Sequence, residues 1–313
     1  MESVNAIYCF SIAGSEGQPT SLPGSPFIAT NLYDPNSFIG LTPNGMTMDS
    51  QGRFFYLSDY DGINDSGQSI NAIRAYTIDA TSGALENGPV LTSTAVAQLS
   101  VQGIDPASKY LYAATVLSSS LAISVYAIDI TTQVLTEVPG SPFFVTNTYE
   151  GAPYNLSLLV SPTGNFVYAS VTDITDGGPG TFVFSVDPAT GALAVVPGSP
   201  FSTGIYSSGA ILHPNGKFLY ATETANQAVA GVSVFAVDTT NGTIDTTPVS
   251  SVTASDYFGV NLIDPSGQVL VFNNSYTASS FTIDGSTGLL TAATGSPFTV
   301  APGWESAIIV KIP

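Results

Sequence analysis

The chain has 313 residues, with 5 Lys and Arg against 23 Asp and Glu, for a formal net charge of -18. Aromatic residues make up 11% and charged residues only 9%, which excludes a disordered chain, and 30 Gly with 21 Pro exclude a coiled coil or helical bundle. Five cations on so acidic a chain exclude a nucleic-acid-binding surface.

Targeting and redox signals are sparse. No run of about 18 apolar residues occurs, so no transmembrane helix is predicted. The first residues, Met1-Glu-Ser-Val4, lack the basic and apolar regions of a signal peptide. Cys9 is the only cysteine, which excludes an intrachain disulfide and a Cys-based zinc site, and predicts an inert thiol buried in a strand.

The first 28 residues predict two strands. A degenerate alternating segment, Ile7-Tyr-Cys-Phe-Ser-Ile12, is followed by Pro23-Gly-Ser-Pro-Phe27. The alternating segment recurs in each later repeat, and Pro-Gly-Ser-Pro-Phe recurs at residues 139–143 and 197–201, with the related Thr294-Gly-Ser-Pro-Phe298 in the last repeat. We therefore expect residues 1–28 to supply only the outer strands of a blade, completed by a strand near the C-terminus within residues 304–313.

Five complete repeats follow, at about residues 42–93, 98–143, 154–201, 206–250 and 257–298. Each holds an apolar run, a residue that we call the anchor, a strand ending in Tyr or Val, an alternating strand ending in Asp, and a short strand. The anchors are Asp49, Asp105, Ser161, His213 and Asp264. Four short antiparallel strands per unit of about 50 residues predict β-propeller blades.

The predicted fold is therefore an all-β propeller over residues 1–313, in one domain of four-stranded antiparallel blades. The tally gives six blades, with seven as the alternative. The N- and C-terminal strands are expected to share the closing blade, which removes free sheet edges.

The repeats resemble the β-propeller lactonase family, the bacterial group named after 6-phosphogluconolactonase and related to the YVTN-repeat propellers. The resemblance rests on the Pro-Gly-Ser-Pro-Phe phrases, on Asp264-Pro-Ser-Gly267, on Asp187-Pro-Ala-Thr-Gly191, and on Tyr-Ala pairs at Tyr112, Tyr168 and Tyr220. It implies either hydrolysis of a sugar lactone or, as in many secreted members, no established activity. The matching residues are turn and core residues, so they indicate fold more than function.

The positions of the Lys and Arg residues disfavour a phosphorylated substrate. Arg53, Lys109 and Lys217 occupy the same repeat position, just after the anchor, and are predicted to lie on one rim. Lys311 stands at an anchor position and Arg74 in an alternating strand. A phosphate site needs converging cations, so 6-phosphogluconolactonase activity is disfavoured. The only histidine, His213, is predicted to cap a turn as the other anchors do rather than to act as a general base.

The opposite rim is the predicted site. Residues seven positions before the anchors should surround an axial mouth. Candidate ligand-binding residues there are Gln98, Tyr154, Asn155, Tyr206, Tyr257 and Trp304. Candidate catalytic carboxylates are Glu150, Asp256 and Glu305. Aromatic faces stack on sugars and carboxylates bind hydroxyl or ammonium groups; the alternative is that these aromatics pack between blades.

One loop on the same rim suggests a cation. Asp59, Asp61 and Asp65 place carboxylates around a glycine, which suits Ca²⁺, but the segment lacks the EF-hand spacing and solvated turns are the preferred explanation. No other cofactor is expected.

Three functions remain open. The first is a secreted or surface binding module for a neutral or cationic small molecule, glycan or peptide. The second is a lactonase-like hydrolase of an unphosphorylated sugar lactone, with rim carboxylates as base. The third is a structural repeat protein without a ligand. A monomer located outside the cytoplasm is expected in each case.

Overall fold

The computed structural model of the chain describes residues 6–7, 10–13, 18–21, 24–25, 27–28, 45–63, 69–93, 100–117, 120–146, 155–172, 180–202, 207–225, 229–254, 261–273 and 277–299. All regular secondary structure within these residues is β-strand. No helix able to cross a membrane occurs in this part of the chain.

Five antiparallel sheets, three of four strands and two in which a fifth strand also pairs with the third, follow one another along the chain, and we call them blades 1 to 5. Blade 1 contains β5 (Met46–Met48), β6 (Phe54–Ile63), β7 (Ser69–Ile78) and β8 (Leu85–Ser93). Blade 2 contains β9 (Ser100–Ile104), β10 (Tyr110–Leu117), β11 (Ser120–Ile128), β12 (Leu135–Glu137) and β13 (Phe143–Thr146). Blade 3 contains β14 (Asn155–Val160), β15 (Phe166–Thr172), β16 (Gly180–Val186) and β17 (Leu193–Val195).

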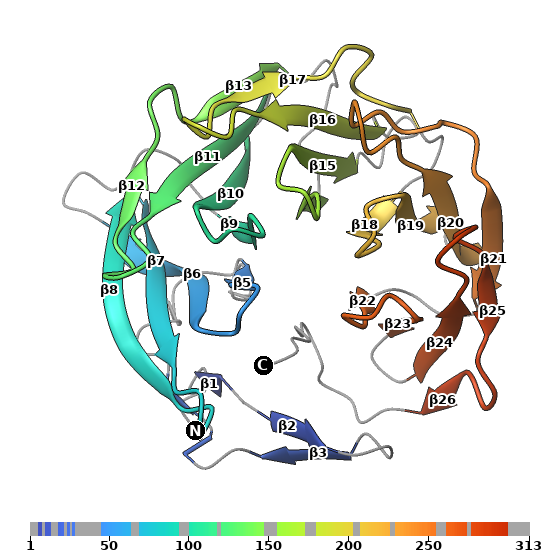
Figure 1. Cartoon of the computed structure of the whole chain (residues 1–313), viewed down its shortest axis with the longest axis horizontal. Coiled ribbons are helices and arrows are strands. Elements are labelled where there is room, and N and C mark those ends of the chain that lie inside the picture. The colour runs from blue at the N-terminus through green and yellow to red at the C-terminus, as the bar shows by residue number, and fades with distance from the viewer. Residues whose placement is uncertain are drawn as a thin grey trace.

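Blade 4 contains β18 (Ser207–Leu212), β19 (Phe218–Ala225), β20 (Val229–Ala236) and β21 (Ser250–Ala254). Blade 5 contains β22 (Asn261–Ile263), β23 (Val269–Asn273), β24 (Thr277–Ile283), β25 (Leu290–Ala292) and β26 (Phe298–Thr299). The blades stand around a ring, and the first strand of each lies nearest the centre (Figure 1). This is the all-β propeller that the repeats predict.

The N-terminal segment forms two ribbons, β1 (Ala6–Ile7) with β4 (Phe27–Ile28) and β2 (Phe10–Ala13) with β3 (Gln18–Ser21). The same pattern occurs in blade 2, where β11 pairs first with β12 and then with β13. The strands β1 and β2 therefore pair with β4 and β3 as a third blade strand pairs with an interrupted fourth strand. Figure 1 shows these ribbons between blade 5 and blade 1. Residues 304–313 lie outside the described residues, so the shared closing blade stays a prediction.

Two Pro-Gly-Ser-Pro-Phe phrases, at residues 139–143 and 197–201, and the related Thr294-Gly-Ser-Pro-Phe298 interrupt the outer strand of blades 2, 3 and 5. Their serine hydroxyls accept a hydrogen bond from a backbone N–H of the third strand: Val125 to Ser141 (3.0 Å), Val183 to Ser199 (2.8 Å) and Ser280 to Ser296 (2.9 Å). The peptide bond after each of these serines is cis. The hydroxyl replaces a strand partner where the outer strand leaves the sheet.

The core lies between the blades. Tyr56, Tyr112, Tyr168 and Tyr220, which follow the anchors in blades 1 to 4, are at most 1% exposed, and each packs in the cluster between its own blade and the next. Alternation along β-strands gives each blade two apolar faces, and stacking buries both. Phe55, Leu57, Tyr76 and Ile78 form a further buried cluster in blade 1, separate from the cluster that blade 1 shares with blade 2.

Candidate functional site

The anchors cap the turns that follow them. Asp105 Oδ1 accepts the backbone N–H groups of Lys109 (2.6 Å) and Tyr110 (2.5 Å), and Asp264 Oδ1 accepts those of Gln268 (2.7 Å) and Val269 (2.6 Å). Ser161 Oγ accepts the N–H of Phe166 at 3.0 Å. The prediction that anchors supply a side-chain acceptor is confirmed. Their lone pairs are occupied by the turn, so they are not available to a substrate.

His213 performs the same task with a ring nitrogen. Its Nδ1 accepts the N–H of Asn215 at 3.0 Å, so the ring proton resides on Nε2, which donates to the carbonyl oxygen of Gly267 at 2.9 Å. The side chain is buried, with 4% exposure. Both nitrogens are engaged, which fits the turn cap predicted from the sequence and leaves no free base at this position.

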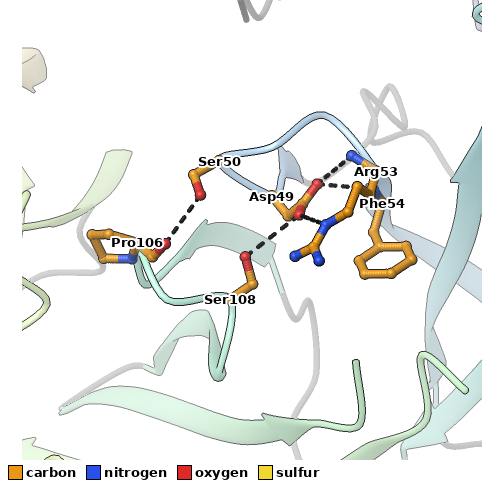
Figure 2. A network of polar contacts seen from close by, with 6 residues as sticks. All are labelled: Asp49, Ser50, Arg53, Phe54, Pro106 and Ser108. Atoms are coloured by element: carbon orange, nitrogen blue, oxygen red, sulfur yellow. Dashed lines mark hydrogen bonds and ion pairs between the residues drawn. The ribbon is translucent and has the colours of Figure 1, made fainter. Parts of the chain in front are cut away.

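The anchor turns also join neighbouring blades. Figure 2 shows the joint between blades 1 and 2, where Asp49 accepts from the backbone and the Nε of Arg53, the latter as an ion pair of 2.8 Å. Ser50 Oγ donates to the carbonyl of Pro106 at 3.0 Å, and Ser108 Oγ lies 3.5 Å from Asp49 Oδ2. The guanidinium also lies over the Phe54 ring, 5.1 Å from its centroid.

The turns between third and fourth strands lie on this same rim, which we call the anchor rim. Lys109 Nζ donates to the carbonyl of Pro188 at 2.5 Å, and Asn215 Nδ2 donates to that of Gly285 at 2.9 Å. Lys109 also lies over the Tyr110 ring at 4.9 Å. The two contacts tie the anchor turns of blades 2 and 4 to the outer turns of blades 3 and 5. Arg53, Lys109 and Lys217 directly precede β6, β10 and β19 on this rim.

Each outer turn begins with an exposed aspartate: Asp79, Asp129, Asp187, Asp238 and Asp284. Hydrogen bonds lower the pKa of each; in Asp79 the N–H and hydroxyl of Ser82 contribute most, and in Asp187 the N–H of Ala189 does. These carboxylates therefore stay ionised and hold turns, so the anchor rim has a structural role.

The sequence predicts a site on the opposite rim, where the second and third strands of each blade meet. Eight of its candidates lie outside the described residues: Gln98, Glu150, Tyr154, Tyr206, Asp256, Tyr257, Trp304 and Glu305. Asn155 is the first residue of β14, and its backbone pairs with Thr172. The structure therefore neither brings these residues together nor separates them.

The proposed calcium loop is corrected in part. Asp59 and Asp61 lie in β6, which continues to Ile63 with an irregular register between Tyr60 and Gly62. They were expected in a loop, but β6 continues through them: Asp59 pairs with Ala72 of β7, and Asp61 lies at the irregularity between Tyr60 and Gly62, beyond which Gly62 and Ile63 pair with β7 again. Asp65 lies outside the described residues. Within the described part of the chain, no group of three His, Cys, Asp or Glu is placed to hold a metal ion.

Sequence reasoning missed the cross-blade contacts and one pocket. An open pocket of about 490 Å³ lies between blades 4 and 5, lined by His213, Ser266, Gly267, Gln268, Val269, Thr282, Ile283 and Gly285. It lies on the anchor rim, and its one imidazole is already engaged on both nitrogens. The repeat register places the anchors but does not indicate which backbone carbonyl in the next blade each side chain reaches.

The geometry defines the protein as an all-β propeller with a structural anchor rim. Its middle region, residues 104–255, matches the family described as "Lactonase, 7-bladed beta-propeller". The resemblance to the β-propeller lactonases drawn from the repeats is thereby confirmed. No curated protein matches the chain.

Solved structures agree on the fold. The periplasmic gluconolactonase PpgL of Pseudomonas aeruginosa superposes with a TM-score of 0.61 at 18% identity, covering 90% of this chain and 76% of that one. A Bacteroides uniformis protein, provisionally assigned as a 6-phosphogluconolactonase, gives 0.56 at 18% identity, covering 94% and 92%. A functionally unknown protein of Desulfotomaculum acetoxidans gives 0.57 at 12% identity, covering 80% and 68%. At such identities the likeness concerns the fold.

Proposed function

We propose that the protein is a lactonase-like hydrolase of an unphosphorylated sugar lactone, acting at the axial mouth on the rim opposite the anchors. The observation that carries the proposal is the match of residues 104–255 to the lactonase family. The binding-module hypothesis, which the sequence put first, receives no support from the comparisons, so the lactonase alternative takes its place.

The anchor rim supports this location of the active site, because its carboxylates and its histidine are already engaged in turn hydrogen bonds. The anchors and the outer-turn aspartates accept backbone hydrogen bonds, and His213 uses both ring nitrogens. Reactive carboxylates are therefore sought on the other rim, where Glu150, Asp256 and Glu305 are the candidates. One of these carboxylates would act as a general base and take a proton from a water molecule while the water oxygen attacks the lactone carbonyl carbon. The ring C–O bond then breaks, and the ring oxygen takes up a proton to give the hydroxy acid.

The cations support an unphosphorylated substrate. Arg53 is ion-paired with Asp49 at 2.8 Å, and Lys109 donates to Pro188 at 2.5 Å. A dianionic phosphate would need several converging cations, whereas these two are held on the anchor rim. Ca²⁺ at Asp59, Asp61 and Asp65 is not required by this chemistry.

The proposal includes six blades and a shared closing blade. The pairing of the N-terminal ribbons and the burial of Phe55 and Tyr76 support a sheet that covers blade 1. The family description counts seven blades, so a seventh is the alternative. A location outside the cytoplasm is proposed as well, since one structural relative is periplasmic.

Activity is tested with D-glucono-1,5-lactone, measured as acid release above the spontaneous rate. We expect turnover, and a loss of roughly 100-fold or more when the acting carboxylate is neutralised in Glu150→Gln, Asp256→Asn or Glu305→Gln. Glu86→Gln, an exposed glutamate on β8, is the matched control and should leave the rate unchanged. Wild-type hydrolysis no faster than buffer would overturn the proposal; loss of glycan capture in Tyr206→Ala or Trp304→Ala would then favour a binding module.

A further inference from the structure

The outer strand of blade 2 carries an aromatic side chain that the blade does not bury. Phe144, the second residue of β13, is 61% exposed, the highest value among the exposed large apolar residues of the described chain. Its neighbours Phe143 and Val145 pack against the core between blades 2 and 3. Since side chains alternate along a strand, Phe144 stands on the other face of the sheet. Packing within the propeller therefore does not account for this residue.

The other copies of the Pro-Gly-Ser-Pro-Phe phrase show that the fold does not require an aromatic residue here. The residue after the phrase is Ser202 in blade 3, Thr299 in blade 5 and Ile28 in the N-terminal copy. Blade 2 has the only phenylalanine among these four copies. The repeats thus serve as internal controls, and they indicate that Phe144 has a role outside its blade.

The strand that carries Phe144 is also an edge of the sheet. Among the described strands β13 pairs only with β11, and Figure 1 shows it on the outer side of the ring. Proteins protect such edges with charges, prolines, irregular pairing or very short strands. The outer strand β8 has Glu86, Pro89 and a shift of register between Arg74 and Tyr76, and β17 and β25 have three residues each. The four residues of β13 include no charge and no proline, and their pairing with β11 is regular.

The sequence of β13 is complementary to itself in an antiparallel pair. With a two-fold axis at Phe144, this residue lies opposite Phe144 of a second copy, and Phe143 lies opposite Val145 of that copy. Residues that point to the same face meet in this register, so the two Phe144 rings contact each other while Phe143 and Val145 stay directed at their own cores. Aromatic side chains opposite each other on neighbouring strands stabilise their pairing.

The absence of charge on this edge permits the contact in an acidic protein. Two copies with a net charge of -18 each repel one another over most of their surfaces. Residues 138–146, which include β13, contain no Asp, Glu, Lys or Arg. A second copy can therefore approach this edge without burying an unpaired carboxylate of the strand.

We infer that β13 pairs with β13 of a second copy of this chain, in a two-fold antiparallel edge contact that covers both Phe144 rings. The inference replaces the monomer expected from the sequence and is independent of the proposed hydrolase function. Two four-residue strands bury far less than the roughly 1,200–2,000 Å² of a stable interface, so the dimer is weak and reversible.

Sedimentation equilibrium tests the dimer at an ionic strength of about 0.15 M, where the Debye length is about 8 Å and the repulsion is screened. We expect the mass to rise with protein concentration from 32.2 kDa toward twice this value. Phe144→Thr, which introduces the residue type of blade 5, should raise the dissociation constant roughly 10-fold or more. The matched control is Val195→Thr at a 50% exposed position of β17, which should leave the dissociation constant unchanged.

A disulfide trap tests the register. Cys9→Ser removes the only native thiol, and Phe144→Cys in this background places two thiols opposite each other across the two-fold axis. Residues opposite each other on antiparallel strands have Cβ atoms about 4.5–5.5 Å apart, close to the separation of a disulfide. We expect a cross-linked dimer on mild oxidation, whereas Val195→Cys in the same background should stay largely uncross-linked.

Three results would overturn the inference. A mass that stays at 32.2 kDa at every concentration excludes the second copy and leaves a strand of another protein as the occupant of this edge. A dimer that forms equally well in Phe144→Thr uses a different surface. Equal cross-linking of the two cysteine variants contradicts the pairing of β13. Because Phe144 is exposed, its variants should keep the wild-type thermal midpoint, which separates a loss of self-association from a loss of folding.

Discussion

The Nε2 of His213 donates a hydrogen bond of 2.9 Å to the carbonyl oxygen of Gly267, so the anchor of blade 4 is joined to the turn that follows the anchor of blade 5. The approach is close: a Cβ on Gly267 would lie 2.7 Å from Cε1 of His213. The same ring caps its own turn through Nδ1. One side chain thus fixes a turn and a blade interface together.

The first prediction concerns this residue. His213→Ala removes the cap and the cross-blade bond from a buried position, and we expect it to lower the free energy of unfolding by roughly 1–3 kcal/mol. His213→Asp, which restores the anchor of blades 1, 2 and 5, should retain the cap and lose less. Both are measured by urea denaturation. Because the ring has no free base, lactone turnover per folded molecule should stay unchanged; its loss in a stably folded His213→Ala would show that the histidine is catalytic.

The sequence predicts the anchors well because the capping interaction is local. An acceptor side chain four or five residues before the N–H groups that it satisfies can be recognised from spacing alone, as with Asp105 and Tyr110. The cross-blade partners could not be predicted, because they depend on the rotation between blades. Ser50 reaches the carbonyl of Pro106, 56 residues away.

The turn at Gln133 is a second feature that could not be predicted from the sequence. It adopts φ +61° where the equivalent turns of the other blades have glycine. Its Nε2 donates to Thr77 of blade 1 at 2.6 Å. A glutamine gives no sequence signal of a left-handed backbone conformation, so this turn could not be predicted from the sequence. The predicted site at the mouth depends on side-chain directions that periodicity does not fix, which is why its candidates remain proposals.

A second prediction compares two glycines. Gly191 has φ +76° and a Cβ there would lie 2.6 Å from the Tyr110 ring, whereas Gly295 has φ +86° with nothing within 4 Å. Gly295→Ala should cost about 1–2 kcal/mol for the left-handed backbone alone. Gly191→Ala adds overpacking of roughly 1–3 kcal/mol. Urea midpoints measure the difference, and equal losses would contradict the packing of this turn against blade 2.

A third prediction uses the buried tyrosine hydroxyls. Tyr220 donates to the carbonyl of Gly288 in blade 5 at 3.3 Å, whereas the hydroxyl of Tyr56 has no hydrogen-bond partner among the described residues. Tyr220→Phe should therefore lower the free energy of unfolding by about 1 kcal/mol. Tyr56→Phe, which keeps the packing and removes a buried unpaired group, should leave it unchanged or raise it. Thermal unfolding distinguishes them, and a larger loss in Tyr56→Phe would show that its hydroxyl is satisfied in solution.

A fourth prediction concerns alkaline unfolding. Burial, with a smaller contribution from Asp49, raises the pKa of Tyr56 to about 12, and burial raises that of Tyr126 to about 12. In the unfolded chain tyrosine titrates near pH 10, so the folded state holds these protons more tightly. The stabilisation is complete below pH ~10 and is lost as pH rises through about 12, on the order of 2–3 kcal/mol for each tyrosine. Urea midpoints should fall steeply over this window, together with the appearance of tyrosinate absorbance. Tyr126→Phe should make the fall shallower, and an unchanged slope in that variant would mean that Tyr126 ionises without unfolding.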